Sequence, residues 1–284
     1  MAALVPLLVK ASIVLLAFGL ALNAKTEDIL FLLRKPGLLL RSVLAMNVIM
    51  PLFAVAFVLL LQLHQGLEFA LVALAISPIP PFLPKKQIKA SGESSYTTSL
   101  LVVSGLLSIV FVPLAVALLG VVFDRPSHMP VTAVAMMVFL TVLGPLLVGL
   151  VVARLAPALS AAISRPLTLI ATALLGVGVI LILFGIWPAV LALLGNGTIA
   201  GIIVFVLVGL FVGHVLGGPD PNDRSVLALA TASRHPGVAI AIAVVNAPGE
   251  KTVLAAVLLY LFVGALVSAP YAMWRQRVRL AAAS

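Results

Sequence analysis

Residues 77–93 read SPIPPFLPKKQIKASGE and lie between two apolar runs, FALVALAI at 69–76 and LLVVSGLLSIVFVPLAVALL at 100–119. The stretch contains four prolines: Pro78, Pro80, Pro81 and Pro84. Each of them lacks an amide donor and clashes with the preceding turn of a helix. We therefore expect an interrupted helix here, and the composition of the chain decides whether the interruption lies in water or in a membrane.

The composition is that of an integral membrane protein. Hydrophobic residues make up 63% of the 284 residues, charged residues 9%, and the mean hydropathy is +1.31. A soluble domain is about half apolar and about a quarter charged. A membrane-spanning helix needs about 20 apolar residues, and nine stretches come close to this. We expect an all-α polytopic protein with one membrane domain over 1–284 and spans at roughly 4–22, 36–62, 67–83, 98–122, 129–153, 166–188, 198–217, 225–245 and 252–274.

The basic residues predict the orientation of these spans. Thirteen of the 17 Lys and Arg residues fall on one side of the nine-span arrangement, three fall on the other side, and Arg234 lies within a span. The side rich in Lys and Arg is the cytoplasmic one. We therefore expect an outer N-terminus and a cytoplasmic C-terminus, in a bacterial inner membrane. The net charge of +9 then reflects topology and not a nucleic-acid partner.

Two segments of the chain resemble each other. GESSYTTSLLVVSGLLSIVFVP at 92–113 and GEKTVLAAVLLYLFVGALVSAP at 249–270 both begin with Gly-Glu and end with proline after the same spacing. Each follows a span that contains proline, and the two begin on opposite sides of the membrane. This is typical of an inverted repeat whose paired broken helices form a site near the membrane midplane. The alternative is a chance coincidence in a chain rich in glycine and proline.

Three stretches resemble the bile acid:sodium symporter family. They are FGLALNAKTEDILFLLRKPGLLLRSVLAMNVIMP at 18–51, the stretch at 77–93, and RHPGVAIAIA at 234–243. The resemblance implies the nine-helix type of this family, in which a core domain with two crossed broken helices packs on a panel domain. We expect the panel at roughly 4–62 and 129–188 and the core at roughly 67–122 and 198–274, with 198–217 in the panel or a linker.

The sodium ligands that the resemblance implies are largely missing. The family positions correspond here to Leu83, Pro84, Thr97, Leu101, Ala230 and Arg234, and of these only Thr97 offers a side-chain oxygen. The eight acidic residues lie in expected loops or at span ends. Sodium requires oxygen ligands, and a guanidinium at the site repels it. We therefore expect no metal site and no sodium coupling at these positions.

Arg234 is the main candidate for a functional side chain, because an ionisable group inside a span is costly. Its guanidinium can bind a carboxylate in a bidentate manner, or donate to carbonyls that the prolines leave free. The alternative is a purely structural link. The backbone at the crossing is expected to comprise Leu83, Pro84, Ser233 and Pro236.

Further candidates for substrate contact are Lys85, Lys86, His235, Asn47 and Thr97. The two lysines can equally be ordinary cytoplasmic-side charges, and His235 can carry a coupled proton or be structural. Asn47 lies beside Met46, which occupies the position of a panel glutamine in the family. On 198–217, Gly209, Gly213 and Gly217 are spaced by four and predict a close-packing face.

The chain lacks the motifs of known enzyme classes, such as His-Glu-x-x-His, a cysteine nucleophile or a phosphate-binding loop. We expect a secondary transporter that moves a small organic anion, bile-acid-like or another carboxylate, across the lipid bilayer by alternating access, without a cofactor. The alternatives are a sodium-independent or proton-coupled carrier of the auxin-efflux-like type, a channel, and a membrane receptor that transports nothing.

Overall fold

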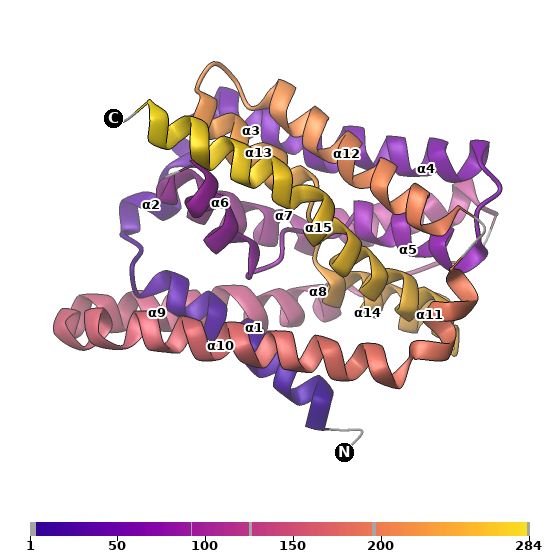
Figure 1. Cartoon of the computed structure of the whole chain (residues 1–284), viewed down its shortest axis with the longest axis horizontal. Coiled ribbons are helices and arrows are strands. Elements are labelled where there is room, and N and C mark those ends of the chain that lie inside the picture. Colours follow the sequence, from indigo (N-terminus) through magenta and orange to yellow (C-terminus); the bar gives the residue numbers. More distant parts are fainter. Residues whose placement is uncertain (1–3, 92, 125–126, 195–196, 283–284) are drawn as a thin grey trace.

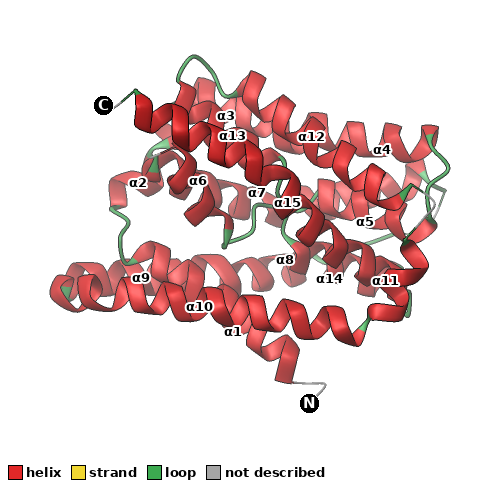
Figure 2. Cartoon of the chain, in the orientation of Figure 1, coloured by secondary structure: helices red, strands yellow, loops and turns green. Residues whose placement is uncertain are grey.

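The computed structural model describes residues 4–91, 93–124, 127–194 and 197–282. Helices make up nearly all of these ranges, and no β-strand occurs in them (Figure 2). The all-α prediction is confirmed. This is the form expected in lipid, because an α-helix satisfies its backbone hydrogen bonds within one segment.

The first half of the chain extends to the end of a long helix at Val122. Its elements are α1 (Leu4–Ala21), α2 (Thr26–Leu30), η1 (Leu32–Arg34), α3 (Pro36–Val43), η2 (Leu44–Ile49), α4 (Met50–Leu60), α5 (Gln65–Ala75), α6 (Leu83–Ser91) and α7 (Ser94–Val122). The segment η2 is a π-helical turn, so that α3, η2 and α4 form one continuous helix.

The second half begins with a helix that also contains a π-helical turn, η3. Its elements are α8 (Val131–Val138), η3 (Phe139–Leu143), α9 (Gly144–Leu155), α10 (Pro157–Gly185), α11 (Trp187–Leu193), α12 (Thr198–Leu216), α13 (Pro221–Thr231), α14 (Pro236–Asn246) and α15 (Lys251–Ala281).

Seven helical stretches in the described ranges are long and apolar enough to cross a membrane, which makes the chain an integral membrane protein. They are Pro36–Leu60, Ser94–Val122, Val131–Leu155, Pro157–Gly185, Thr198–Leu216, Pro221–Asn246 and Lys251–Ala281. Two further apolar helices, Leu7–Ala21 and Gln65–Ala75, are shorter. At 1.5 Å per residue, α5 alone covers only about half of a membrane core of about 30 Å. The expected count of nine spans therefore stays a prediction.

The helices form two groups. Helix α1 packs against α9 and α10, and these three helices, which we call the α1 group, lie along the lower edge in Figure 1. Helices α3, α4 and α12 lie along the upper edge, and α5, α6, α7 and α13 lie between the two edges. The ends of the chain lie apart, with the C-terminus beside the upper group and the N-terminus below the lower one.

The expected panel combines the continuous helix at 36–60 with α1, and this assignment stays a prediction. Its α4 segment packs against α5, and its η2 segment packs against α12 and α13. The buried face of the helix includes Met46 and Met50, which are part of the hydrophobic core.

The proline-rich stretch interrupts a helix, as expected. Helix α5 ends at Ala75, α6 begins at Leu83, and the backbone between them is not helical. A second interruption separates α13 from α14 at residues 232–235. Contacts between α5 and α14, and between α6 and α13, show that the two interrupted helices cross. They run in opposite directions in Figure 1.

The structure corrects the expected backbone of the crossing. Ser233 lies in a non-helical segment, but Leu83, Pro84 and Pro236 belong to the first turns of α6 and α14. Proline fits a first turn because the amide groups there have no partner within the helix, and its fixed φ suits the helix start. The prolines therefore begin the second half-helices, and the residues before them form the breaks.

The two similar segments follow the two interrupted helices. Glu93 immediately precedes α7 and Glu250 immediately precedes α15, and each long helix carries the matching proline, Pro113 or Pro270, in its interior. Gly92, which opens the first segment, lies outside the described residues. The broken helix followed by a long helix is thus a unit that occurs twice.

The glycines of α12 form a close-packing face, as predicted. A Cβ atom at Gly209 would lie 2.8 Å from the Cα atom of Ala232, and one at Gly213 would lie 2.5 Å from the Cα atom of Ala228. Real Cβ atoms do not approach backbone this closely, so the α13 backbone rests directly on α12. This contact fixes the half-helix that leads into the second break.

We predict that Gly213→Ala destabilises the protein. The added methyl group meets backbone atoms that cannot turn aside, so α12 and α13 must separate, at a cost of about 1–3 kcal/mol. Gly176→Ala on α10 is the matched control, because no atom lies within 4 Å of its Cβ position. Thermal unfolding in detergent measures both variants. Equal melting temperatures for the two would contradict direct backbone contact between α12 and α13.

Candidate functional site

The two breaks are joined by a direct hydrogen bond. The backbone N–H of His235 donates to the carbonyl of Pro78, at 2.8 Å. Residues 77–81 and 234–236 are all buried. Non-helical backbone at this depth is tolerated only where protein or a water-filled cavity satisfies it. Each break therefore supplies part of the hydrogen bonding that the other lacks.

Arg234 lies at the centre of this crossing with 1% of its surface exposed. Its Nη2 donates to the carbonyl of Met46 at 3.0 Å, and Nη1 makes a longer contact of 3.4 Å with the carbonyl of Ser77. Its Nε has no hydrogen-bond partner among the described residues. We call Arg234 with these two carbonyls the arginine clasp. It connects the second break, the first break and the helix at 36–60.

The carbonyl of Met46 is available because of the π-helical turn η2. In this turn the N–H of Met50 donates to the carbonyl of Ala45, five residues back. The same register would pair Met46 with the nitrogen of residue 51, and Pro51 has no N–H to donate. The carbonyl of Met46 is therefore left for a donor from elsewhere, and Nη2 of Arg234 supplies it.

Tyr260 on α15 supports the second break. Its hydroxyl donates to the carbonyl of Ala232 at 2.7 Å, and its side chain is 2% exposed. Ala232 directly follows α13, so its carbonyl lies where the helical hydrogen bonds end. The tyrosine thereby positions the backbone from which Arg234 extends.

His235 begins α14. Its Nδ1 accepts from the N–H of Gly237 at 3.1 Å, which satisfies one of the free amides of the first turn. The neutral ring therefore carries its proton on Nε2. That nitrogen is buried and has no partner in the part of the chain that the structure describes.

A cavity of about 140 Å³ lies between the first break, α6, the second break and α15; we call it the α6–α15 cavity. Lys86 and Arg234 are the charged residues that line it. The Nζ of Lys86 donates to the hydroxyl of Ser268 at 2.5 Å, and this hydroxyl donates in turn to the carbonyl of Gly264 at 2.5 Å. Two cationic residues thus border a cavity that has no acidic residue in its described lining.

A second cavity lies between α1, α6 and α10 and is also basic. Its lining consists of Asn23, Lys85, Ser164, Arg165, Thr168 and Leu169. Lys85 and Lys86 are neighbours in the chain but line different cavities. Both cavities lie on the α6 side of the crossing, and all the charged residues in their described linings are basic.

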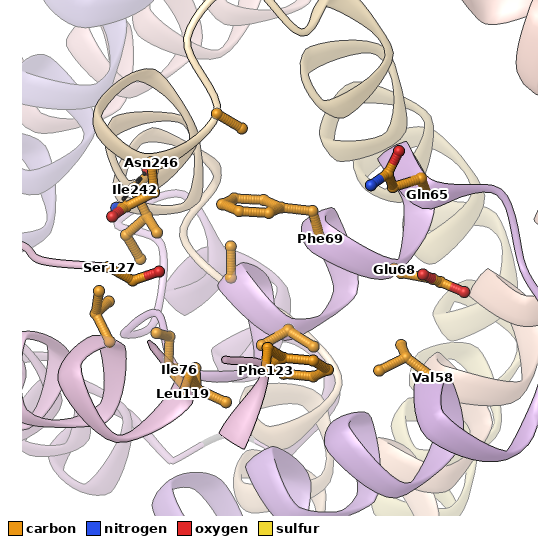
Figure 3. Close-up of a pocket in the computed structure, with 14 residues that line it drawn as sticks. Val58, Gln65, Glu68, Phe69, Ile76, Leu119, Phe123, Ser127, Ile242 and Asn246 are labelled. Atoms are coloured by element: carbon orange, nitrogen blue, oxygen red, sulfur yellow. Dashed lines mark hydrogen bonds between the residues drawn. The ribbon is translucent and has the colours of Figure 1, made fainter. Parts of the chain in front are cut away.

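A third cavity, of about 260 Å³, lies between α5, α7 and α14 on the other side of the crossing (Figure 3). Phe69, Ile76 and Phe123 contribute apolar walls, and Ile76 directly precedes Ser77 of the arginine clasp. Glu68 lines this cavity, and its Oε1 accepts from the N–H of Leu63 at 3.2 Å. Cavities thus approach the crossing from both sides, and they differ in the sign of their charged residues.

The structure brings together four of the residues expected at the site. Leu83, Lys86, Ser233 and Arg234 line the α6–α15 cavity, and His235 follows directly in the chain. Lys85 lines the neighbouring cavity.

Two other expected site residues lie elsewhere. The hydroxyl of Thr97 donates to the carbonyl of Glu93 at 2.6 Å, within the first turn of α7. Asn47 is half-buried in η2. What any of these residues binds stays a prediction.

The positions that correspond to sodium ligands in the family have a buried, mainly apolar lining. Leu83 is 3% exposed, and Leu101 and Ala230 are fully buried. Thr97 uses its hydroxyl hydrogen within its own helix. No group of three His, Cys, Asp or Glu residues suited to a metal ion occurs within the described ranges of the chain.

Sequence reasoning missed Tyr260, Ser268 and the carbonyl of Met46. The first two carry a recognisable signal, since each is a polar side chain inside an otherwise apolar span. The carbonyl of Met46 carries a weaker signal, which is Pro51 five residues later in the chain. Its consequence depends on the π-helical register, and the sequence pattern did not reveal that register.

Comparison with known families identifies the family of the chain. A family model described as the sodium bile acid symporter family matches residues 11–193, which is more than half of the chain. The chain belongs to this family. Its members are membrane transporters, typically of bile acids and other organic anions. The match includes the first break and α6 but ends before the second break, so Arg234 lies outside it. A search of curated protein sequences found no match.

We predict that Tyr260→Phe loosens the second break. The carbonyl of Ala232 loses its donor, which costs about 1–3 kcal/mol for a buried group. Because the chain has no cysteine, a single Ser233→Cys variant reports on the break through its rate of alkylation by a maleimide. The rate should rise in the Tyr260→Phe background. Tyr271→Phe is the control, since its hydroxyl bonds to His214 away from the break. An unchanged rate with Tyr260→Phe would show that Tyr260 does not hold the break.

Proposed function

We propose that this protein is a secondary transporter that moves a small organic anion by alternating access, with Arg234 as the positive charge at the site. The observation that supports this most directly is the arginine clasp. A guanidinium is fixed at the crossing of two broken helices, and the cavities on the α6 side carry no acidic residue in their described linings to balance it.

The electrostatics favour an anion as substrate. A positive charge in a low-dielectric environment is unfavourable unless an opposite charge or several hydrogen bonds compensate it. Helices α6 and α14 both begin at the crossing, and the N-terminus of a helix carries partial positive charge. An anion that binds here relieves this excess of positive charge, whereas a cation adds to it.

The same charge argues against sodium as the coupling ion. In the family resemblance, Arg234 replaces a ligand of sodium and Ala230 replaces another. The arginine clasp bonds the backbone carbonyls of Met46 and Ser77, as a bound cation would. We propose that the guanidinium takes the structural part of sodium at this crossing and that transport is independent of sodium. A proton is the alternative coupling ion; on His235 it would have to bind Nδ1, because Nε2 already carries the proton of the neutral ring, and it would displace the N–H of Gly237.

The distribution of the cavities suggests how access alternates. One cavity approaches Ile76 from the α7 and α14 side, and another approaches Pro80 from the α6 side. We propose that the group of α1, α8, α9 and α10 forms the panel and that the remaining long helices, including the one at 36–60, form the core. Relative movement of the two groups would open one side at a time. The basic residues at the α6 end favour this end as the cytoplasmic one.

The proposal predicts transport of carboxylates without sodium. Uptake of labelled butyrate and labelled cholate into proteoliposomes should be the same in sodium and in choline buffers. Arg234→Ala should reduce uptake by roughly ten- to a hundredfold, because a charge-assisted hydrogen bond is lost, and Arg234→Lys should reduce it less. Melting temperatures confirm that each variant folds. A steep dependence on sodium, or full activity of folded Arg234→Ala, would contradict the proposal.

A second prediction concerns a variant in which two of the sodium ligands of the family are restored. The double variant Ala230→Glu, Arg234→Gln places two oxygen-bearing side chains at the crossing and removes the competing charge. Its melting temperature should rise in sodium chloride relative to choline chloride, because a bound ion stabilises the native state. The unaltered protein should show no such rise. A rise in the unaltered protein would place sodium in a site away from Ala230 and Arg234.

A further inference from the structure

The size of the α6–α15 cavity limits what can bind beside Arg234. Its volume is about 140 Å³. A cavity of about 150 Å³ admits benzene, which has six carbon atoms, whereas pockets for drug-sized ligands measure about 300–1,000 Å³. A four-ring bile acid is therefore too large to lie wholly within this partly open cavity, whereas an anion of about six non-hydrogen atoms fits.

The polar groups of the cavity suit one carboxylate. Lys86 uses one of its three N–H groups for Ser268 and has two left for a ligand. Ser233 adds a hydroxyl group to the lining, whereas the hydroxyl of Ser268 already donates to the carbonyl of Gly264. A carboxylate offers about four lone-pair sites on two oxygens. These donors are sufficient for one carboxylate, and a second carboxylate would need further donors that the mainly apolar remainder of the described lining does not offer.

The charges give an independent reason for an anion here. Lys86 and Arg234 border the same small cavity and repel each other unless a negative charge lies between them. Lys86 is half-buried and Arg234 is fully buried, so water screens this repulsion only in part. Because Ser268 is neutral, its hydrogen bond with Lys86 leaves the positive charge of Lys86 unbalanced.

The rest of the lining is apolar. Phe82, Leu83 and Leu261 come from the first break, α6 and α15, and they leave room for a short alkyl chain. Each CH₂ group that such a chain buries should tighten binding by about fourfold. This gain in affinity must stop when the alkyl chain fills the cavity.

We propose that the substrate is a short-chain monocarboxylate, whose carboxylate is bound by Lys86 beside Arg234, with Ser268 positioning the Lys86 ammonium, and whose alkyl chain lies in the α6–α15 cavity. This inference rests on the proposed function and narrows its substrate class. Lys85, one residue earlier, plays no part in binding because it lines the cavity toward α10.

The test measures binding of acetate, propionate, butyrate, octanoate and cholate to the purified full-length protein by isothermal titration calorimetry. Affinity should increase about fourfold per CH₂ from acetate to butyrate and decrease at octanoate, and cholate should not bind. Lys86→Gln should weaken butyrate binding at least tenfold, and Ser268→Ala should weaken it less. The matched control Lys85→Gln should change it less than twofold. The size series uses the unaltered protein and does not depend on the folding of any variant.

Several results would overturn the proposal. Cholate that binds more tightly than butyrate, or equal losses in Lys86→Gln and Lys85→Gln, would exclude the α6–α15 cavity as the substrate site. If cholate binding is then lost in Arg234→Ala, the proposed function stands and only the substrate class is wrong. If no carboxylate of any size binds, both proposals fail.

Discussion

The structure depends on how two interrupted helices satisfy their backbone inside a membrane. Breaking a helix leaves carbonyl and amide groups without partners, and lipid offers none. The arginine clasp, the bond between His235 and Pro78, and the hydroxyl of Tyr260 supply these partners. All three act within a few residues of the second break. The positions of the half-helices, and of the cavities beside them, therefore follow from a small set of hydrogen bonds.

The glycine face of α12 complements this set by van der Waals contact. It lets the backbone of α13 approach α12 directly, so the half-helix before the second break has a rigid support. Arg275 on α15 adds a further contact, since its Nε donates to the hydroxyl of Ser225 on α13 at 2.7 Å. Helix α13 is thus held by packing and by polar contacts, and the break that follows it carries the charge of Arg234.

The sequence predicted the features that depend on local chemistry. Proline-rich interruptions, the glycine spacing on α12 and the repeated Glu-to-Pro segments each follow from residue types at short range. It did not predict features that depend on three-dimensional neighbours. The hydrogen bond from Arg234 to Met46 requires a π-helical register, and the separation of Lys85 from Lys86 requires knowing which helix faces which. The position of the helix at 36–60 likewise depends on which helices its buried face contacts.

A positive charge that is bonded to the chain has an electrical consequence. A symporter that carries sodium with an anion moves both charges together, whereas Arg234 cannot leave with the substrate. In the sodium-independent transport proposed above, each anion would move one negative charge across the membrane. A membrane potential of 100 mV changes the free energy of that step by about 2.3 kcal/mol. In a cell whose interior is negative, this term drives the anion outward.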